Sequence, residues 1–206
     1  MKRFVSVFFI FTVVVSAEIV RFKADKFSYK MSYPKQIICS GNAKVFSGTN
    51  VIYADKIIIS GKNLDEAVCT GNVKLVDLES KTVLLSSKME YYQNDDYVRL
   101  LVDPFFISKD FTIKSGIMER YNSLRLSFIQ GPSVIETSNV RIKCMFGNYE
   151  EENKIARLYG PVEILHNLKS NLSFNTNRVF CNEIIFFNEE NRMLLGVVSG
   201  KVWFDE

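Results

Sequence analysis

The residues best suited to chemistry in this chain are four cysteines, one histidine and several acidic runs. Cys39, Cys69, Cys144 and Cys181 are widely spaced and His166 is the only imidazole, so their spacing does not resemble a zinc site. No serine or cysteine stands in a triad-like spacing with His166, and no glycine-rich phosphate loop occurs. The residues therefore predict a protein that is not an enzyme and has no metal or cofactor.

The acidic runs recur at regular intervals along the chain, which favours turns over acid–base or metal chemistry. Each run lies beside Asn, and Asn and Asp accept turn conformations and bond their own backbone. Asp103, which precedes Pro104, is likewise expected in a turn or bulge. The expected hairpin turns are Asn63–Glu66, Asn94–Asp96, Asn122–Ser123, Glu150–Asn153 and Asn188–Asn191.

The elements that position these residues repeat with a period of about thirty residues. Ala24-Asp25-Lys26 recurs as Ala54-Asp55-Lys56, thirty residues later. Gly41-Asn42-Ala43-Lys44-Val45 recurs at the same offset as Gly71-Asn72-Val73-Lys74-Leu75. Weaker copies place the equivalent of Gly41 at 103, 131, 160 and 200, with Asp at 103. Fixed periods of this length are typical of stacked repeat architectures.

Apolar and polar residues alternate within each copy, as in strands with one buried face. A second strand type follows each of these positions, and its alternation slips at 54–56, 86–88 and 137–139, where we expect a bulge or bend. About six units of two strands amount to roughly twelve to fifteen strands. No helical pattern competes after residue 18. The prediction is an all-β fold, an elongated two-sheet sandwich or jelly roll.

The first seventeen residues have the pattern of a secretory signal peptide. Lys2 and Arg3 precede a short apolar run that ends in small residues, and cleavage is expected after Ala17. An uncleaved inner-membrane anchor is the alternative, although the run is shorter than the roughly 20 residues of a spanning helix. We expect residues 18–206 to form a single domain in the periplasm.

Composition excludes several other classes of protein. The chain is 206 residues long, and only 10 Gly and 4 Pro rule out a collagen-like fibre or a low-complexity segment. The net charge of +3 is too small for the electrostatic footprint of a nucleic-acid-binding protein. Nucleic acid is therefore not an expected partner.

The tandem motifs resemble those of the LptA/OstA-like family, the periplasmic lipopolysaccharide-transport bridge proteins. The resemblance rests on Ala24–Lys26, Gly41–Val45, Ala54–Lys56 and Gly71–Leu75, with weaker copies up to the end of the chain. It implies an open β-jelly roll whose groove carries the acyl chains of lipopolysaccharide or another envelope glycolipid. It also implies end-to-end strand pairing with homologous domains of inner-membrane-anchored and outer-membrane components. A membrane-anchored relative of the same pathway and an envelope scaffold without cargo are the alternatives.

Residues on the inward face are the candidates to line such a groove, although an ordinary dry core would need the same alternation. Cys39 and Cys69 hold equivalent inward positions and are either small core residues or a possible disulfide, for which parallel side chains fit poorly. Ile19, Val20 and Phe22 at one end, and Val202 and Phe204 at the other, are expected edge-strand contacts for partners or a head-to-tail homo-oligomer. The candidate groove residues are Val45, Ile52, Cys69, Val73, Leu75, Leu84, Leu101, Phe105, Ile135, Leu158, Val162 and Ile164.

Overall fold

The computed structural model describes residues 11–15, 18–137, 140–150, 152–153, 155–167, 176–187 and 192–195. Within these ranges every regular element is a β-strand, which confirms the all-β prediction. No helix in the described ranges has the length and apolar character needed to cross a membrane. The sixteen strands are β1 (Phe11–Val15), β2 (Glu18–Lys23), β3 (Lys26–Lys30), β4 (Gln36–Ser47), β5 (Asn50–Ser60), β6 (Glu66–Asp77), β7 (Val83–Tyr92), β8 (Tyr97–Leu101), β9 (Phe105–Ile107), β10 (Thr112–Lys114), β11 (Ile117–Tyr121), β12 (Leu126–Glu136), β13 (Val140–Glu150), β14 (Ile155–Asn167), β15 (Thr176–Phe187) and β16 (Arg192–Leu195).

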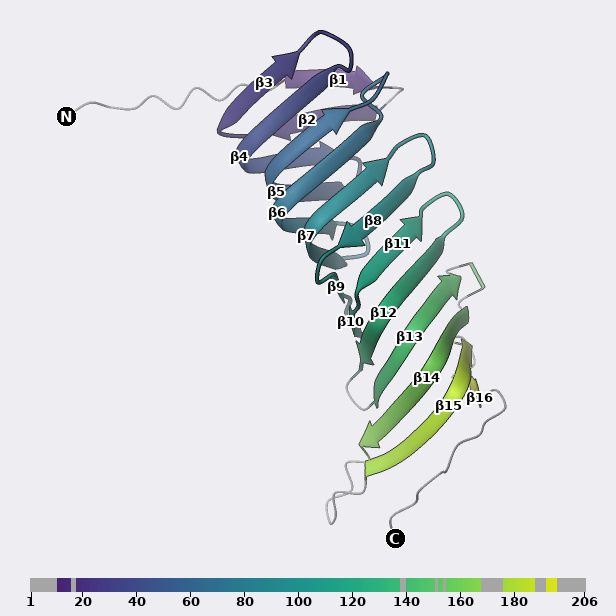
Figure 1. Ribbon diagram of the computed structural model, residues 1–206. Coiled ribbons are helices and arrows are strands. Elements are labelled where there is room, and N and C mark those ends of the chain that lie inside the picture. The colour runs from purple at the N-terminus through teal and green to yellow at the C-terminus, as the bar shows by residue number, and fades with distance from the viewer. Residues whose placement is uncertain are drawn as a thin grey trace, which may run out of the picture.

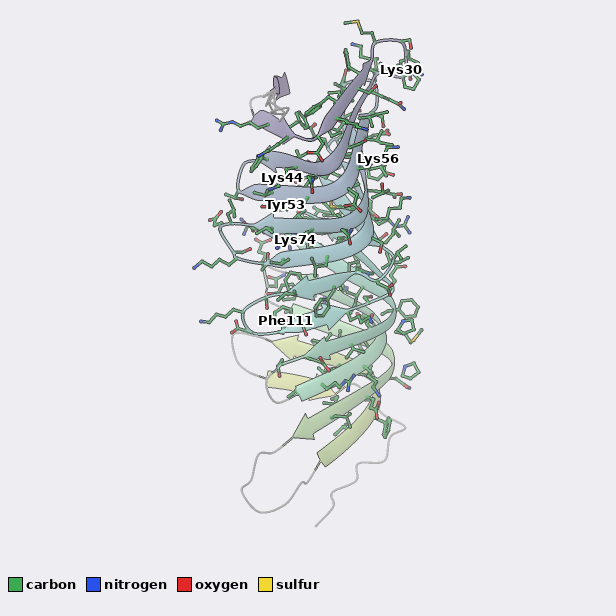
Figure 2. All side chains as sticks on the ribbon, turned by 90° about the vertical axis from the view of Figure 1, so that its left-hand side faces the viewer. Lys30, Lys44, Tyr53, Lys56, Lys74 and Phe111 are labelled. Atoms are coloured by element: carbon green, nitrogen blue, oxygen red, sulfur yellow. The ribbon has the colours of Figure 1, made fainter. Side chains whose placement is uncertain are left out.

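The strands stack antiparallel along one long axis, from β3 at the N-terminal end to β15 near the C-terminal end (Figure 1). The long strands β4–β7 and β12–β15 change pairing register near their middle. Two leaves result, and the strands bend between them (Figure 2). Leaf A has the order β1-β2-β4-β5-β6-β7-β9-β10-β12-β13-β14-β15, and leaf B has the order β3-β4-β5-β6-β7-β8-β11-β12-β13-β14-β15-β16.

The recurring motif residues lie at the line where the two leaves meet. Gly71 and Asn72 oppose the single residue Asp55, so each strand bulges there and turns the corner. Gly71 and Asn72 both have positive φ (70° and 45°), a conformation that glycine and asparagine tolerate best. Asn72 Nδ2 donates to Asp55 Oδ2 at 3.0 Å, and Asn42 donates to Asp25 in the same way at 2.9 Å.

The expected bends at 54–56 and 86–88 lie on this line and are confirmed by the register shifts there. The expected bend at 137–139 is wrong, because β12 ends at Glu136 and β13 begins at Val140 as its antiparallel neighbour. Thr137 N donates to Val140 O at 2.9 Å, so the chain reverses direction between Glu136 and Val140. A turn between two strands and a bend within one strand both show a short polar run in the sequence, and here the run lies at a chain reversal.

The expected turns at 63–66, 94–96, 122–123 and 150–153 lie between successive strands, as predicted. The turn at 188–191 is outside the described residues. His166 lies in β14 and pairs with Val140 and Asn177 across the ladder.

The weak third copy of the motif is displaced by one residue from its expected position. Val102 and Asp103 have positive φ (64° and 53°) and take the places of Gly and Asn, while Ser87 N donates to Val102 O as Asp25 N donates to Gly41 O. Asp103 therefore corresponds to Asn42 and not to Gly41. A shift of one residue exchanges the two faces of a strand, so inward positions near 103 are even-numbered.

In the full chain the N-terminal end of the sheet has other edges than those expected for a chain cleaved after Ala17. β2 is paired on both sides, by β1 and β4, so Ile19, Val20 and Phe22 do not form an edge in the full chain. Among the described strands, β1 ends leaf A and β3 ends leaf B at this end of the stack. The strand expected around Val202 and Phe204 lies outside the described residues, as do residues 16–17 at the expected cleavage site.

Candidate functional site

The inner face of leaf A carries an uninterrupted file of apolar side chains that crosses eleven strands. Each member is the direct register partner of the next, from β2 to β15. At about 4.8 Å between neighbouring strands, the file is about 48 Å long. We name this set the inner file; its members are Phe22, Val45, Ile52, Leu75, Leu84, Phe106, Ile113, Ile135, Ile142, Ile164 and Val179.

The burial of the inner residues falls with distance from the line where the leaves meet. Next to that line, Ala43, Ala54 and Val73 are almost fully buried. One rung further out, Ile52 and Leu75 are only half-buried, and most of the inner file behaves in the same way. The leaves therefore enclose a dry crease with a partly open apolar border, which we call the trough.

Leaf B supplies the opposite wall of the trough. Ile37, Ile59, Ala67, Tyr91 and Val98 are successive register partners on its inner face. All five are buried or pack against the buried cluster. The wall becomes more polar at β11, where Arg120 is the partner of Val98, and Arg120 Nε donates to Asn122 Oδ1 at 3.0 Å.

A cavity of about 110 Å³ lies between the leaves in the N-terminal half of the trough. Apolar residues of both leaves line most of it, among them Phe22, Ile37 and Ile57. Polar groups of Asp65 and Gln93 lie at its border. The cavity therefore lies where the inner faces of the two leaves approach each other.

Most of the groove residues predicted from the sequence lie in or against the buried cluster. These are Val45, Ile52, Cys69, Val73, Leu75, Leu84, Ile135, Leu158, Val162 and Ile164. They do not share one surface, since Cys69 and Leu158 belong to leaf B and the others to leaf A. Sequence alternation identified the inward face but not the leaf.

The inward assignment of Leu101 and Phe105 is wrong. Leu100 is the inward residue, with 2% of its surface exposed, and Leu101 pairs with Lys88 on the outer side. Phe106 packs on the core, whereas Phe105 pairs with the outward-facing Leu85. The cause is the displaced third copy, in which Val102 occupies the glycine position. Period-two alternation counted from Val98 would have given the correct face.

Sequence reasoning also missed several residues that complete the trough. Phe22 was expected at an edge, and its side chain is instead buried in the inner file. Ile113 and Val179 complete the file on β10 and β15. Ile113 lies in a strand of three residues, which is too short for alternation to be recognised in the sequence.

The four cysteines are buried and unbonded, so the possible disulfide between Cys39 and Cys69 is wrong. Both residues pair with Ile57 of the intervening strand β5, which places them two strands, or about 10 Å, apart. This exceeds the Cα separation that a disulfide can bridge. Burial raises the pKa of Cys39 and Cys144 to about 11, and burial together with the neighbouring Cys39 raises that of Cys69 to about 12. These thiols act as small core residues.

A second hollow, of about 520 Å³, lies on the outer face of leaf B beside Tyr92, Tyr97 and Tyr121. The rings are register partners, with centroids 5.9 and 4.7 Å apart. Tyr97 Oη donates to Glu119 Oε1 at 2.7 Å, and burial together with this carboxylate raises the pKa of Tyr97. The Nε of Arg99 is 3.1 Å from the same carboxylate oxygen. These contacts link side chains of three neighbouring strands, β7, β8 and β11, to one another.

The described residues contain no group of three or more His, Cys, Asp or Glu side chains that could hold a metal ion. No protein-family model matches the chain, and no curated protein matches its sequence. Among solved structures, the chain is similar to LptH from Pseudomonas aeruginosa, described as the LptA-homologous periplasmic component of the lipopolysaccharide transport device. The two are 10% identical, the match covers 68% of this chain and 81% of LptH, and the TM-score is 0.31.

Proposed function

We propose that the protein is a non-enzymatic periplasmic lipid carrier that shields acyl chains in the trough. The observation that supports it is the inner file, which offers apolar contact in every strand of leaf A from β2 to β15 without a polar interruption. Each buried CH₂ contributes about 0.8 kcal/mol, so a long chain gains affinity from many equivalent contacts. Because the rungs are alike, a chain can move along the file by small steps.

The headgroup of such a lipid would remain at the border of the trough, where half-buried residues give way to polar ones. Lipopolysaccharide or another envelope glycolipid fits this arrangement, since only its acyl part needs an apolar wall. Homologous domains of inner- and outer-membrane components would extend the trough by pairing with its end strands.

Photocrosslinking from neighbouring residues of opposite face tests the carrier proposal. A photoreactive amino acid at Phe106 or Leu84 faces the trough, whereas one at Phe105 or Leu85 in the same strands faces outward. Lipid adducts are expected from the first pair and not from the second. Equal labelling of both pairs, or none from Phe106 and Leu84 in cells, would contradict lipid carriage in the trough.

The small size of the cavity favours a second candidate function, an envelope scaffold with a dry core. A volume of about 110 Å³ is below the roughly 300–1,000 Å³ of typical small-molecule sites, so carriage requires the leaves to part. Native mass spectrometry of protein extracted from its own membranes separates the two. Bound lipid supports the carrier, and a lipid-free mass at all detergent concentrations supports the scaffold.

A further inference from the structure

Large apolar side chains are exposed together in the hairpin formed by β3, β4 and the turn between them. Met31 and Tyr33 in the turn are 79% and 81% exposed, the highest values among the large hydrophobic residues of the described chain. Tyr29 and Phe27 in β3 are also exposed, and every residue of β3 is solvent-accessible. We call residues 26–35 the exposed hairpin.

The exposed hairpin lies at the N-terminal end of the stack (Figure 1), with Lys30 at the extreme end (Figure 2). β3 pairs only with β4 among the described strands. Phe27 and Tyr29 are register partners of Cys39 and Ile37, so they continue the inner face of leaf B onto its last described strand. The apolar inner face therefore reaches the surface at this end.

Positive charge accompanies these apolar groups. Lys26, Lys30 and Lys35 lie in the exposed hairpin, and no Asp or Glu occurs between residues 26 and 54. The preceding carboxylate, Asp25, accepts a hydrogen bond from Asn42 Nδ2 at 2.9 Å at the line between the leaves. On leaf A, Lys44 and Lys74 flank Tyr53, with their Nζ atoms 4.8 and 5.9 Å from its ring centroid (Figure 2).

We propose that the exposed hairpin is a membrane-contact element that docks this end of the protein onto an anionic lipid leaflet. Tyrosine rings and a methionine suit the interfacial layer, because their apolar bodies are buried there while the polar ends stay wet. Lysines near an anionic surface add electrostatic attraction. An acidic protein partner would use the lysines but would not require four exposed apolar side chains at one end of the sheet.

Vesicle co-sedimentation of the full chain tests this docking. The probes are vesicles of phosphatidylcholine alone and vesicles of equal parts phosphatidylcholine and phosphatidylglycerol. We expect binding to the anionic vesicles that weakens as salt rises. Lys30→Glu with Lys35→Glu is expected to weaken it at least about tenfold, and Met31→Ser with Tyr33→Ser to weaken it as well. The matched controls, Lys81→Glu with Lys109→Glu and Leu124→Ser, are expected to bind like the parent chain.

A local probe separates the exposed hairpin from the apolar segment at residues 4–17, which every variant shares. Tyr33→Trp in a chain that also carries Trp203→Phe places a single indole at the turn. Leu124→Trp in the same background is the control, because Leu124 is 66% exposed but lies in the turn between β11 and β12. Brominated lipids in the anionic vesicles are expected to quench the indole at position 33 and not the one at 124.

Three results would overturn the docking proposal: no quenching at position 33, equal quenching at both positions, or unchanged binding after both hairpin substitutions. Loss of self-association in the hairpin variants without any vesicle binding would also overturn it and would assign the surface to a second copy of the chain. The outcome is independent of lipid carriage, because adducts from Phe106 report the trough and vesicle binding reports the exposed hairpin.

Discussion

Replacing Gly71 by alanine tests whether the leaves meet at a line maintained by the repeat motif. Gly71 has φ of +70°, and a Cβ built there would lie 2.4 Å from Asp55 Oδ2 and 3.0 Å from Asp55 Cβ. The carboxylate cannot move away freely, because its Oδ2 accepts the hydrogen bond from Asn72 Nδ2 at 3.0 Å. The substitution therefore combines a strained backbone with a steric clash.

The expected cost follows from these two contributions. A left-handed backbone costs a residue with a Cβ about 1–2 kcal/mol. Moving the exposed Asp55 carboxylate away from the new Cβ breaks its hydrogen bond with Asn72 and adds about 0.5–1.5 kcal/mol. Gly131→Ala is the matched control, since Gly131 has φ of +85° but the nearest atom to its Cβ is Gly116 Cα at 3.5 Å. We expect a loss of about 1.5–3.5 kcal/mol for Gly71→Ala and about 1–2 kcal/mol for Gly131→Ala.

Urea unfolding of the single and double variants measures these differences through the midpoint at constant m-value. In the background of Asp55→Ala, the clash is absent, so the cost of Gly71→Ala should fall to that of the backbone alone. Hydrogen exchange should become faster in β5 and β6 first, because units of a stacked architecture contact only their neighbours. The reasoning is refuted if Gly71→Ala costs no more than Gly131→Ala, or if Asp55→Ala and Gly71→Ala are additive.

Three further predictions concern the strand faces, the thiols and Tyr97. In urea unfolding, Leu100→Ala should destabilise the protein by about 2–5 kcal/mol and Leu101→Ala by less than about 1 kcal/mol, because only Leu100 faces the core. The reverse order would show that Leu101 is the inward residue, as the sequence alone predicted. The native protein should not react with a thiol reagent at pH 8 and should show no Cys39–Cys69 peptide under non-reducing mass spectrometry, since the pKa values of these two thiols are about 11 and 12. In an alkaline ultraviolet titration, one phenol should ionise at higher pH than the others, and this late step should be missing in Tyr97→Phe. Because the pKa of Tyr97 is raised in the folded protein, the contribution of this phenol to stability is complete below the ordinary tyrosine pKa of about 10 and is lost progressively above it. An unchanged titration in Tyr97→Phe would argue against the Glu119 contact.

The sequence by itself determined the strand character and two of the three expected bends, those at 54–56 and 86–88. Alternation of apolar and polar residues indicates a half-buried strand when one face of the strand is buried along its whole length. The pairing of Asp55 with Gly71 and Asn72 is also readable in the motif, since a bulge with positive φ restricts residue type at each position. Local backbone conformation and burial on one face are properties of a short segment, so they can be predicted from the residues of that segment.

Only the tertiary structure decided which strands lie between two equivalent positions, which leaf each inward residue joins and which face Leu101 presents. Cys39 and Cys69 look adjacent in the repeat, but β5 runs between them because each repeat contains two strands. Val102 adopts positive φ without being glycine, so sequence alignment on glycine misplaced the third copy by one residue and exchanged its faces. β9 and β10 continue leaf A, while β8 and β11 continue leaf B. This division depends on pairing between segments that are distant in the chain, so no local sequence pattern predicts it.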